Sequence, residues 1–120
     1  MSYRPRWWIP HAIIDPRQIE ASFGAARAQL PTTEVKIEAG SEGTVHVSFC
    51  LQGVSEPSCW ATLDLHQGTA ENGGTEVISF EACTPPFLTV AGRPVLIDPP
   101  EALYAAIDTL VTSLGGWFEG

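Results

Sequence analysis

The sequence has no lysine or arginine between Ile37 and Gly92. Seven acidic residues fall within that stretch: Glu38, Glu42, Glu56, Asp64, Glu71, Glu76 and Glu81. Five of the six basic residues lie upstream, only Arg93 lies downstream, and the formal net charge of the 120-residue chain is -8. Because an acidic surface repels phosphate backbones, we expect no nucleic-acid partner and favour a partner that carries positive charge.

The chain also lacks long apolar runs and the usual cysteine motifs. The first ten residues have neither the apolar run nor the small-residue cleavage site of a signal peptide. No stretch approaches the roughly 20 apolar residues of a membrane span. The three cysteines, Cys50, Cys59 and Cys83, have no CxxC spacing, which argues against a disulfide framework and against a structural zinc site. We therefore expect inert cysteines, no membrane association and a cytoplasmic location.

Two segments carry the residues that start a helix. Residues 15–18, Asp-Pro-Arg-Gln, supply an N-cap acceptor, a proline in the first turn and a glutamine that can complete a capping box, which predicts a helix over residues 16–30. Residues 98–101, Asp-Pro-Pro-Glu, repeat this pattern and predict a helix over residues 99–114. Each predicted helix has one apolar stripe, formed by Ile19, Phe23, Ala26 and Leu30 in the first and by Leu103, Ile107, Leu110 and Leu114 in the second.

Between the helices, four segments alternate apolar and polar residues as half-buried strands do. The residues expected to face the core are Val35, Ile37 and Ala39; Val45, Val47, Phe49 and Leu51; Cys59, Ala61, Leu63 and Leu65; and Ile78, Phe80 and Ala82. Short or glycine-rich connections favour an antiparallel meander, and a small hairpin around Gly92-Arg93 is expected after it.

These elements predict an α+β fold, a two-layer sandwich in the order α-β-β-β-β-α. It would have a meander of four or more antiparallel strands and both helices on one face of the sheet. Residues 1–14 are expected to form a Trp- and Arg-containing N-terminal arm, and residues 15–120 a single α+β domain.

The outward face of this sheet can be mapped by pairing Ala39 with Val45, Val47 with Leu63, and Leu63 with Ile78. The resulting cross-strand rows are Glu38, His46, Asp64, Val77; then Lys36, Ser48, Thr62, Ser79; then Glu34, Cys50, Trp60, Glu81. In the first row His46 lies between two carboxylates, a set that can bind a divalent ion or move a proton. Ordinary pairing of opposite charges across strands explains the same row, and we favour that interpretation.

No catalytic residue, metal ligand or cofactor is predicted, and whether the protein is an enzyme stays open, with a non-enzymatic role favoured. Cys50 and Cys83 have no cationic neighbour that would activate a thiolate, and no Gly-x-Ser-x-Gly elbow occurs.

The aromatic residues suggest a contact surface. Trp60 is expected to face outward, where a large indole is typical of a binding hot spot, unless Trp7-Trp8-Ile9 or Trp117-Phe118 covers it. The N-terminal arm could cover it within its own monomer or reach a second copy and form a homodimer.

The sequence therefore favours a small acidic protein-binding module that meets a basic partner through its open sheet face. Bacterial immunity proteins and secretion chaperones share this size and charge. The expected partner-binding residues are Trp60, Asp64, Glu81, Glu38, His46, Trp7 and Trp8. The alternatives are a small-ligand or metal-binding domain, including an enzyme subunit, that uses the His46 row or a pocket lined by Phe49, Phe80 and Tyr104, and a self-assembling structural protein.

Overall fold

The structure is a computed structural model of the chain, and it describes residues 6–11, 14–53, 59–68, 73–81, 87–96, 98 and 100–118. The elements in chain order are β1 (Arg6–Ile9), α1 (Pro16–Ala26), η1 (Arg27–Gln29), β2 (Thr33–Ala39), η2 (Ser41–Gly43), β3 (Val45–Leu51), β4 (Cys59–His66), β5 (Thr75–Glu81), β6 (Phe87–Val90), β7 (Arg93–Leu96), α2 (Pro100–Ser113) and β8 (Trp117–Phe118).

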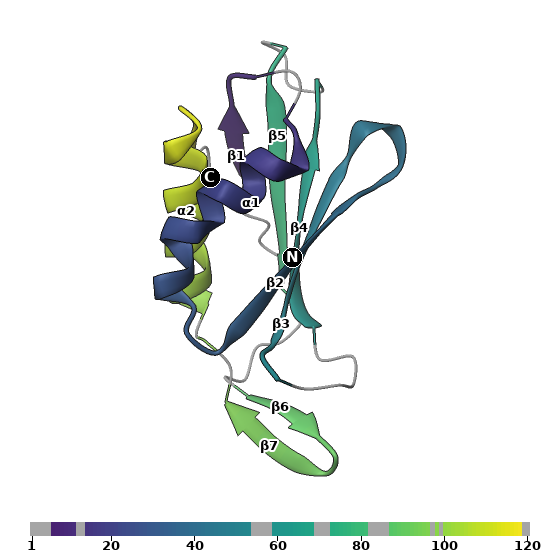
Figure 1. The fold of residues 1–120 in the computed structure, drawn as a ribbon, viewed down its shortest axis with the longest axis vertical. Coiled ribbons are helices and arrows are strands. Elements are labelled where there is room, and N and C mark those ends of the chain that lie inside the picture. The colour runs from purple at the N-terminus through teal and green to yellow at the C-terminus, as the bar shows by residue number, and fades with distance from the viewer. Residues whose placement is uncertain are drawn as a thin grey trace.

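The main sheet has six strands in the order β2-β3-β4-β5-β1-β8, and each neighbouring pair is antiparallel. Both α1 and α2 lie on the same side of this sheet (Figure 1). The expected α+β sandwich is confirmed. The expected hairpin is present as β6–β7, a separate two-stranded sheet that projects from one end of the molecule (Figure 1).

The first helix begins as its sequence predicts. The Asp15 side chain accepts from the backbone N–H of Arg17, and the Gln18 side chain accepts from the backbone N–H of Asp15, so the capping box is complete. The α-helical part ends at Ala26, earlier than the predicted residue 30, and continues as the short 3-10 helix η1. The second helix, Pro100–Ser113, lies within one residue of its predicted bounds at each end.

Asp98, expected to cap the second helix, forms hydrogen bonds that connect the chain just before α2 to the start of β2. Its Oδ2 accepts a 2.6 Å hydrogen bond from Thr33 Oγ1 and a 3.2 Å bond from the backbone N–H of Thr32. The Asp98 side chain is buried, and so is Thr33. Hydrogen bonds to a buried carboxylate offset its loss of hydration, so this contact fixes the start of β2 against the segment that leads into α2.

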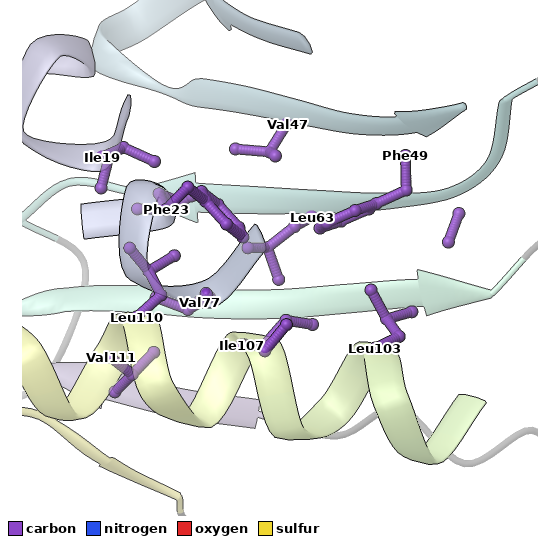
Figure 2. Close-up of a cluster of buried hydrophobic side chains, with 14 of the residues drawn as sticks. Ile19, Phe23, Val47, Phe49, Leu63, Val77, Leu103, Ile107, Leu110 and Val111 are labelled. Carbon is purple, nitrogen blue, oxygen red and sulfur yellow. The ribbon is translucent and has the colours of Figure 1, made fainter. Parts of the chain in front are cut away.

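The core lies between the helices and the sheet. Ile19 and Phe23 from α1 belong to the same buried cluster as Leu103, Ile107 and Leu110 from α2 (Figure 2). The strands contribute Val47, Phe49, Leu63 and Val77 to the same cluster (Figure 2). Burial of these side chains is the main favourable term that holds the two layers together.

The register between β4 and β5 differs by one residue from the expected one. Leu63 pairs with Ser79, and Leu65 pairs with Val77. Val77 is therefore inward and fully buried, so its predicted place in the outward row with Asp64 is wrong. The strand has adjacent apolar residues, Val77 and Ile78, and either can satisfy an alternating pattern. The pairing of β5 with β1, which places buried Trp7 opposite Val77, is consistent with the observed choice.

A bulge in β4 overturns the outward placement of Trp60. Phe49 pairs with Ala61, but the next pair is Cys50 with Cys59, so Trp60 is the extra residue on its strand. An extra residue breaks the alternation of side chains between the two faces. Trp60 is only 2% exposed, and its ring lies 6.2 Å from that of Phe49, between centroids.

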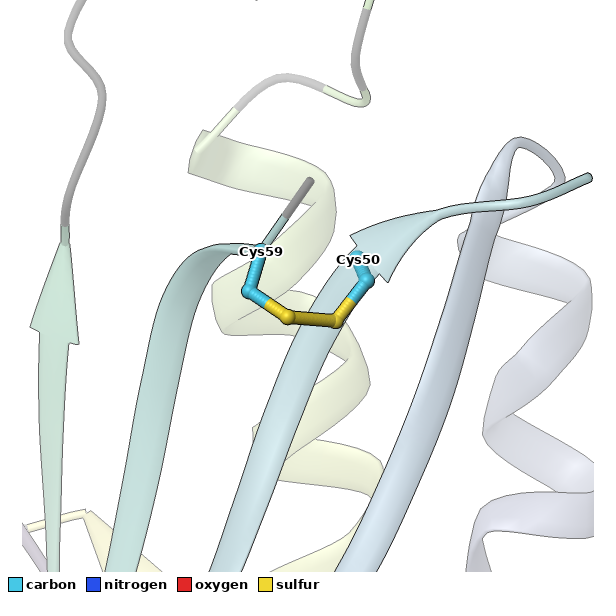
Figure 3. The surroundings of a disulfide bond; sticks show 2 residues. All are labelled: Cys50 and Cys59. Carbon is cyan, nitrogen blue, oxygen red and sulfur yellow. A yellow bond between two sulfur atoms is a disulfide. The ribbon is translucent and has the colours of Figure 1, made fainter. Parts of the chain in front are cut away.

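The same bulge brings two cysteines directly opposite each other, and they form a disulfide (Figure 3). The expectation that the cysteines form no disulfide and stay inert is therefore wrong for Cys50 and Cys59. Nothing in a spacing of nine residues indicates this bond, because it depends on the strand pairing and on the irregularity within it. Cys83, the third cysteine, lies outside the described residues, as does Ala82.

The described part of the N-terminal arm is a strand of the sheet. Arg6–Ile9 lies between β5 and β8 of its own chain, and Trp7 and Ile9 join the core. Among the described residues, neither helix is long and apolar enough to cross a membrane.

Candidate functional site

The sheet face opposite the helices, here called the open face, holds the outward side chains of its strands. Among the side chains that the structure describes, they are Glu34, Lys36 and Glu38 from β2; His46 and Ser48 from β3; Thr62, Asp64 and His66 from β4; Glu76 from β5; Arg6 and Trp8 from β1; and Trp117 from β8. Their placement follows from strand alternation, because the residues between them, such as Val47, Leu63 and Trp7, are buried in the core.

The central contact of the open face joins His46 and Asp64. The two residues are directly opposed on β3 and β4, and Nδ1 of His46 lies 2.5 Å from Oδ1 of Asp64. Glu38 pairs with His46 from the other side, so the predicted cross-strand order Glu38, His46, Asp64 over β2, β3 and β4 is confirmed. The side chains are 49% exposed for His46 and 21% exposed for Asp64, which makes them available to a partner.

Gly40 gives the His46 ring its position. A Cβ built on Gly40 would lie 2.5 Å from Cδ2 and 2.6 Å from Nε2 of His46, so a larger residue would displace the ring. The Gly40 N–H also donates to the carbonyl of Thr44 across the β2–β3 turn, over 2.6 Å. A carboxylate at Nδ1 favours the tautomer that carries the proton on Nδ1, and it orients the ring.

A second cross-strand row lies beside the first and ends in exposed aromatic surface. His66 pairs with Glu76, Glu76 with Trp8, and Trp8 with Trp117. Arg6 lies 3.6 Å from Glu76, between Nε and Oε1. Trp8 is half-buried and Trp117 is 46% exposed. From the sequence, Trp117 is expected only as a cover for Trp60. Its place on the open face depends on pairing with β1, at the other end of the chain, which no local pattern indicates.

The other expected site residues lie elsewhere. Trp7 is 1% exposed, contacts Tyr104 and Phe118, and donates from Nε1 to Asp108 over 2.6 Å. Trp60 is buried by the bulge. Glu81 pairs with Ala61 rather than with Trp60, and its side chain lies outside the described part. Of the seven expected residues, Glu38, His46 and Asp64 therefore lie together, and Trp8 lies further across the same face.

The geometry gives less support to the alternative sites predicted from the sequence. Within the described ranges, no three His, Cys, Asp or Glu side chains are arranged to hold a metal ion. Phe49, expected to line a pocket, is fully buried and packs edge-on against Phe23 at 6.0 Å between ring centroids. A groove of about 300 Å³ lies instead at the start of β2, lined by Arg27, Leu30, Pro31, Thr33, Glu34, Val35 and Gln52.

Comparison with protein-family models, with curated proteins and with solved structures gives no match.

Proposed function

We propose that the protein is a small acidic binding module that engages a basic surface of another protein through its open face. The observation that carries the proposal is the placement of the described helices: α1 and α2 both pack on one side of the sheet (Figure 1), and the outward residues of the other side include a charged row, Glu38, His46 and Asp64. A sheet whose second face is charged and accessible is a ready interaction surface for a complementary partner.

Charge on this face is unevenly divided. Arg6 lies beside Glu76 near one side of the face. Glu34, Glu38 and Asp64 lie toward the other side, where Lys36 is the only lysine or arginine among the described residues. This excess agrees with the net charge of -8 for the whole chain. Opposite charge on a partner would speed association and orient the encounter. Exposed indole surface at Trp8 and Trp117 would supply apolar contact area at the neighbouring side.

An inhibitor or immunity-type protein that neutralises a basic toxin, and a chaperone that masks a basic region of its client, both fit this proposal. The sequence predicts a cytoplasmic location, and the Cys50–Cys59 disulfide weighs against it, because disulfides persist mainly in oxidising compartments. The proposal does not depend on the compartment, since it rests on the open face.

The test uses a matched pair of charge reversals. A partner is first recovered by gentle isolation of the protein from its source, and its affinity is then measured by calorimetry for wild type, Glu38→Lys and Glu20→Lys. Glu20 is exposed on α1, on the helical side of the sheet, so both variants change the net charge equally.

Glu38→Lys should weaken binding about tenfold or more, and raising the salt concentration to about 0.5 M should weaken wild-type binding as well. Glu20→Lys should stay close to wild type. Equal losses in both variants would show that net charge alone matters, and a loss confined to Glu20→Lys would place the interface on the helices; either result rejects the open face.

A further inference from the structure

We propose that two copies of the chain pair through their β2 strands, antiparallel about a two-fold axis at Ile37, and so form one continuous sheet. This inference goes beyond the proposed function, because it concerns the edge of the sheet rather than its open face. It rests on the hydrogen-bonding groups, apolar side chains and charges that β2 presents at that edge.

β2 ends the sheet order, and its only strand partner among the described elements is β3. At the two ends of this pair, Gly40 N–H donates to Thr44 and Gln52 N–H donates to Thr32. Backbone groups alternate in direction along an antiparallel strand, so the even-numbered residues bond to β3. The N–H and C=O groups of Val35, Ile37 and Ala39 therefore point to the unpaired edge, which can template a further strand.

The apolar side of β2 is incompletely covered by the helices. Val35 and Ile37 are only partly buried, and Ala39 is exposed, whereas Val45, Val47 and Phe49 on the neighbouring strand are fully covered. Figure 1 shows the tip of the β2–β3 hairpin extending away from both helices. A second β2 strand would bring matching apolar side chains to this uncovered edge.

Two-fold axes at Val35, Lys36 and Ile37, the three central residues of β2, all satisfy the alternation of backbone groups, and two of these three registers conflict with the structure. An axis at Lys36 would place Lys36 against its own copy and Glu34 against Glu38, so like charges would be directly opposed. An axis at Val35 would need the N–H of Thr33, but this group already donates to the Leu30 carbonyl over 3.2 Å.

An axis at Ile37 has neither defect. It pairs Ile37 with Ile37 and Val35 with Ala39 through the unpaired backbone groups, and it opposes Lys36 to Glu38 twice, once on each side of the axis. Opposite charges directly across a strand pair stabilise the pair, and this complementarity identifies a second copy as the occupant. In the same register, the β2–β3 turn of the second copy would lie beside the groove at Leu30 and Pro31.

The charge pairs provide the first test. Light scattering after size exclusion, over a concentration series, should give a wild-type mass approaching twice 12.9 kDa. Lys36→Glu replaces both attractive pairs by repulsive ones and should raise the dimer dissociation constant about tenfold or more. The double variant Lys36→Glu/Glu38→Lys restores opposite charges across the axis, keeps the net charge of wild type and should recover the dimer.

The backbone provides the second test. Ile37→Pro removes the backbone N–H of residue 37, which points to the free edge of β2. A sheet tolerates proline at such an edge position, because no hydrogen bond within the monomer is lost. This variant should keep the far-ultraviolet circular dichroism of wild type and lose the dimer. Wild type that stays a monomer at about 1 mM, where about 4 kcal/mol would suffice for association, overturns the proposal. A dimer that survives Ile37→Pro also overturns the proposal. A dimer that is strengthened by Lys36→Glu rejects the Ile37 register.

Discussion

The indole Nε1 of Trp7 donates a 2.6 Å hydrogen bond to Oδ1 of Asp108 and thereby joins β1 to α2, across 101 residues of sequence. Trp7 is almost completely buried, so its N–H depends on this carboxylate. Asp108→Ala should lower the free energy of unfolding by about 1–3 kcal/mol, because it leaves a buried donor unpaired. Urea denaturation measures this loss, and Glu20→Ala on exposed α1 should stay within about 0.5 kcal/mol of wild type. Equal effects of both substitutions would contradict the role of the bond.

Trp60 provides the converse case, because its buried Nε1 has no hydrogen-bond partner within the described part of the chain. Trp60→Phe removes an unsatisfied donor together with some apolar contact, whereas Trp7→Phe removes a donor that is satisfied by Asp108. We expect Trp60→Phe to be the milder of the two, with a difference of about 1 kcal/mol in the free energy of unfolding. Denaturation curves showing the reverse order would reject this account of the two indoles.

The Cys50–Cys59 disulfide closes a short loop and should contribute to stability. The sequence separation of nine residues corresponds to about 2–3 kcal/mol in the chain-entropy description. Reduction with dithiothreitol, or the Cys50→Ser/Cys59→Ser variant, should lower the midpoint of urea unfolding accordingly. Mass spectrometry after alkylation of denatured, unreduced protein should show one labelled cysteine; three labelled cysteines would contradict the bond.

Two glycines should respond differently to alanine. A Cβ at Gly116 would lie 2.1 Å from the backbone carbonyl oxygen of Trp8, which cannot move without disturbing the β1–β8 pair. A Cβ at Gly40 would meet chiefly the half-exposed ring of His46, which can turn aside, and would lie 3.1 Å from the Thr44 carbonyl oxygen. Gly116→Ala should therefore lower the melting temperature clearly more than Gly40→Ala. The nuclear magnetic resonance signals of the His46 ring should shift in Gly40→Ala and not in Gly116→Ala.

The bond between Thr33 and Asp98 should be worth more than an exposed hydroxyl contact. Thr33→Val keeps the shape of the side chain but removes the 2.6 Å donor to a buried carboxylate, which should cost about 1.5–3 kcal/mol. Thr109 offers a matched control, since its Oγ1 bonds to the Ala105 carbonyl in an exposed turn of α2. Comparable stabilities of Thr33→Val and Thr109→Val would show that Asp98 is adequately paired without Thr33.

Local rules predicted much of this fold because they act within a few residues. The capping box at Asp15 is one example. The β6–β7 hairpin is another, but its turn is formed by Ala91 and Gly92, both at positive φ, one residue earlier than the predicted Gly92-Arg93. The row from Glu38 through His46 to Asp64 was also predictable, since short, patterned connections constrain the β2–β3 and β3–β4 registers.

The misplaced residues depend on long-range pairing. The bulge that buries Trp60 and aligns Cys50 with Cys59 leaves no local signal, because the strand pattern alternates normally on both sides of it. Val77 and Ile78 are both apolar, so only the packing of β1 against β5 distinguishes their faces. Trp117 reaches the open face through β8, a strand of two residues that is too short for any periodicity to indicate.

The most direct test of the proposed binding role is native mass spectrometry of the untagged protein isolated gently from its source. The account predicts a complex of the 12.9 kDa chain, or of its dimer, with a basic protein, and this complex should dissociate as the salt concentration before analysis is raised. A spectrum that shows only the chain with itself, or the chain with a retained small ligand or metal ion, would contradict it.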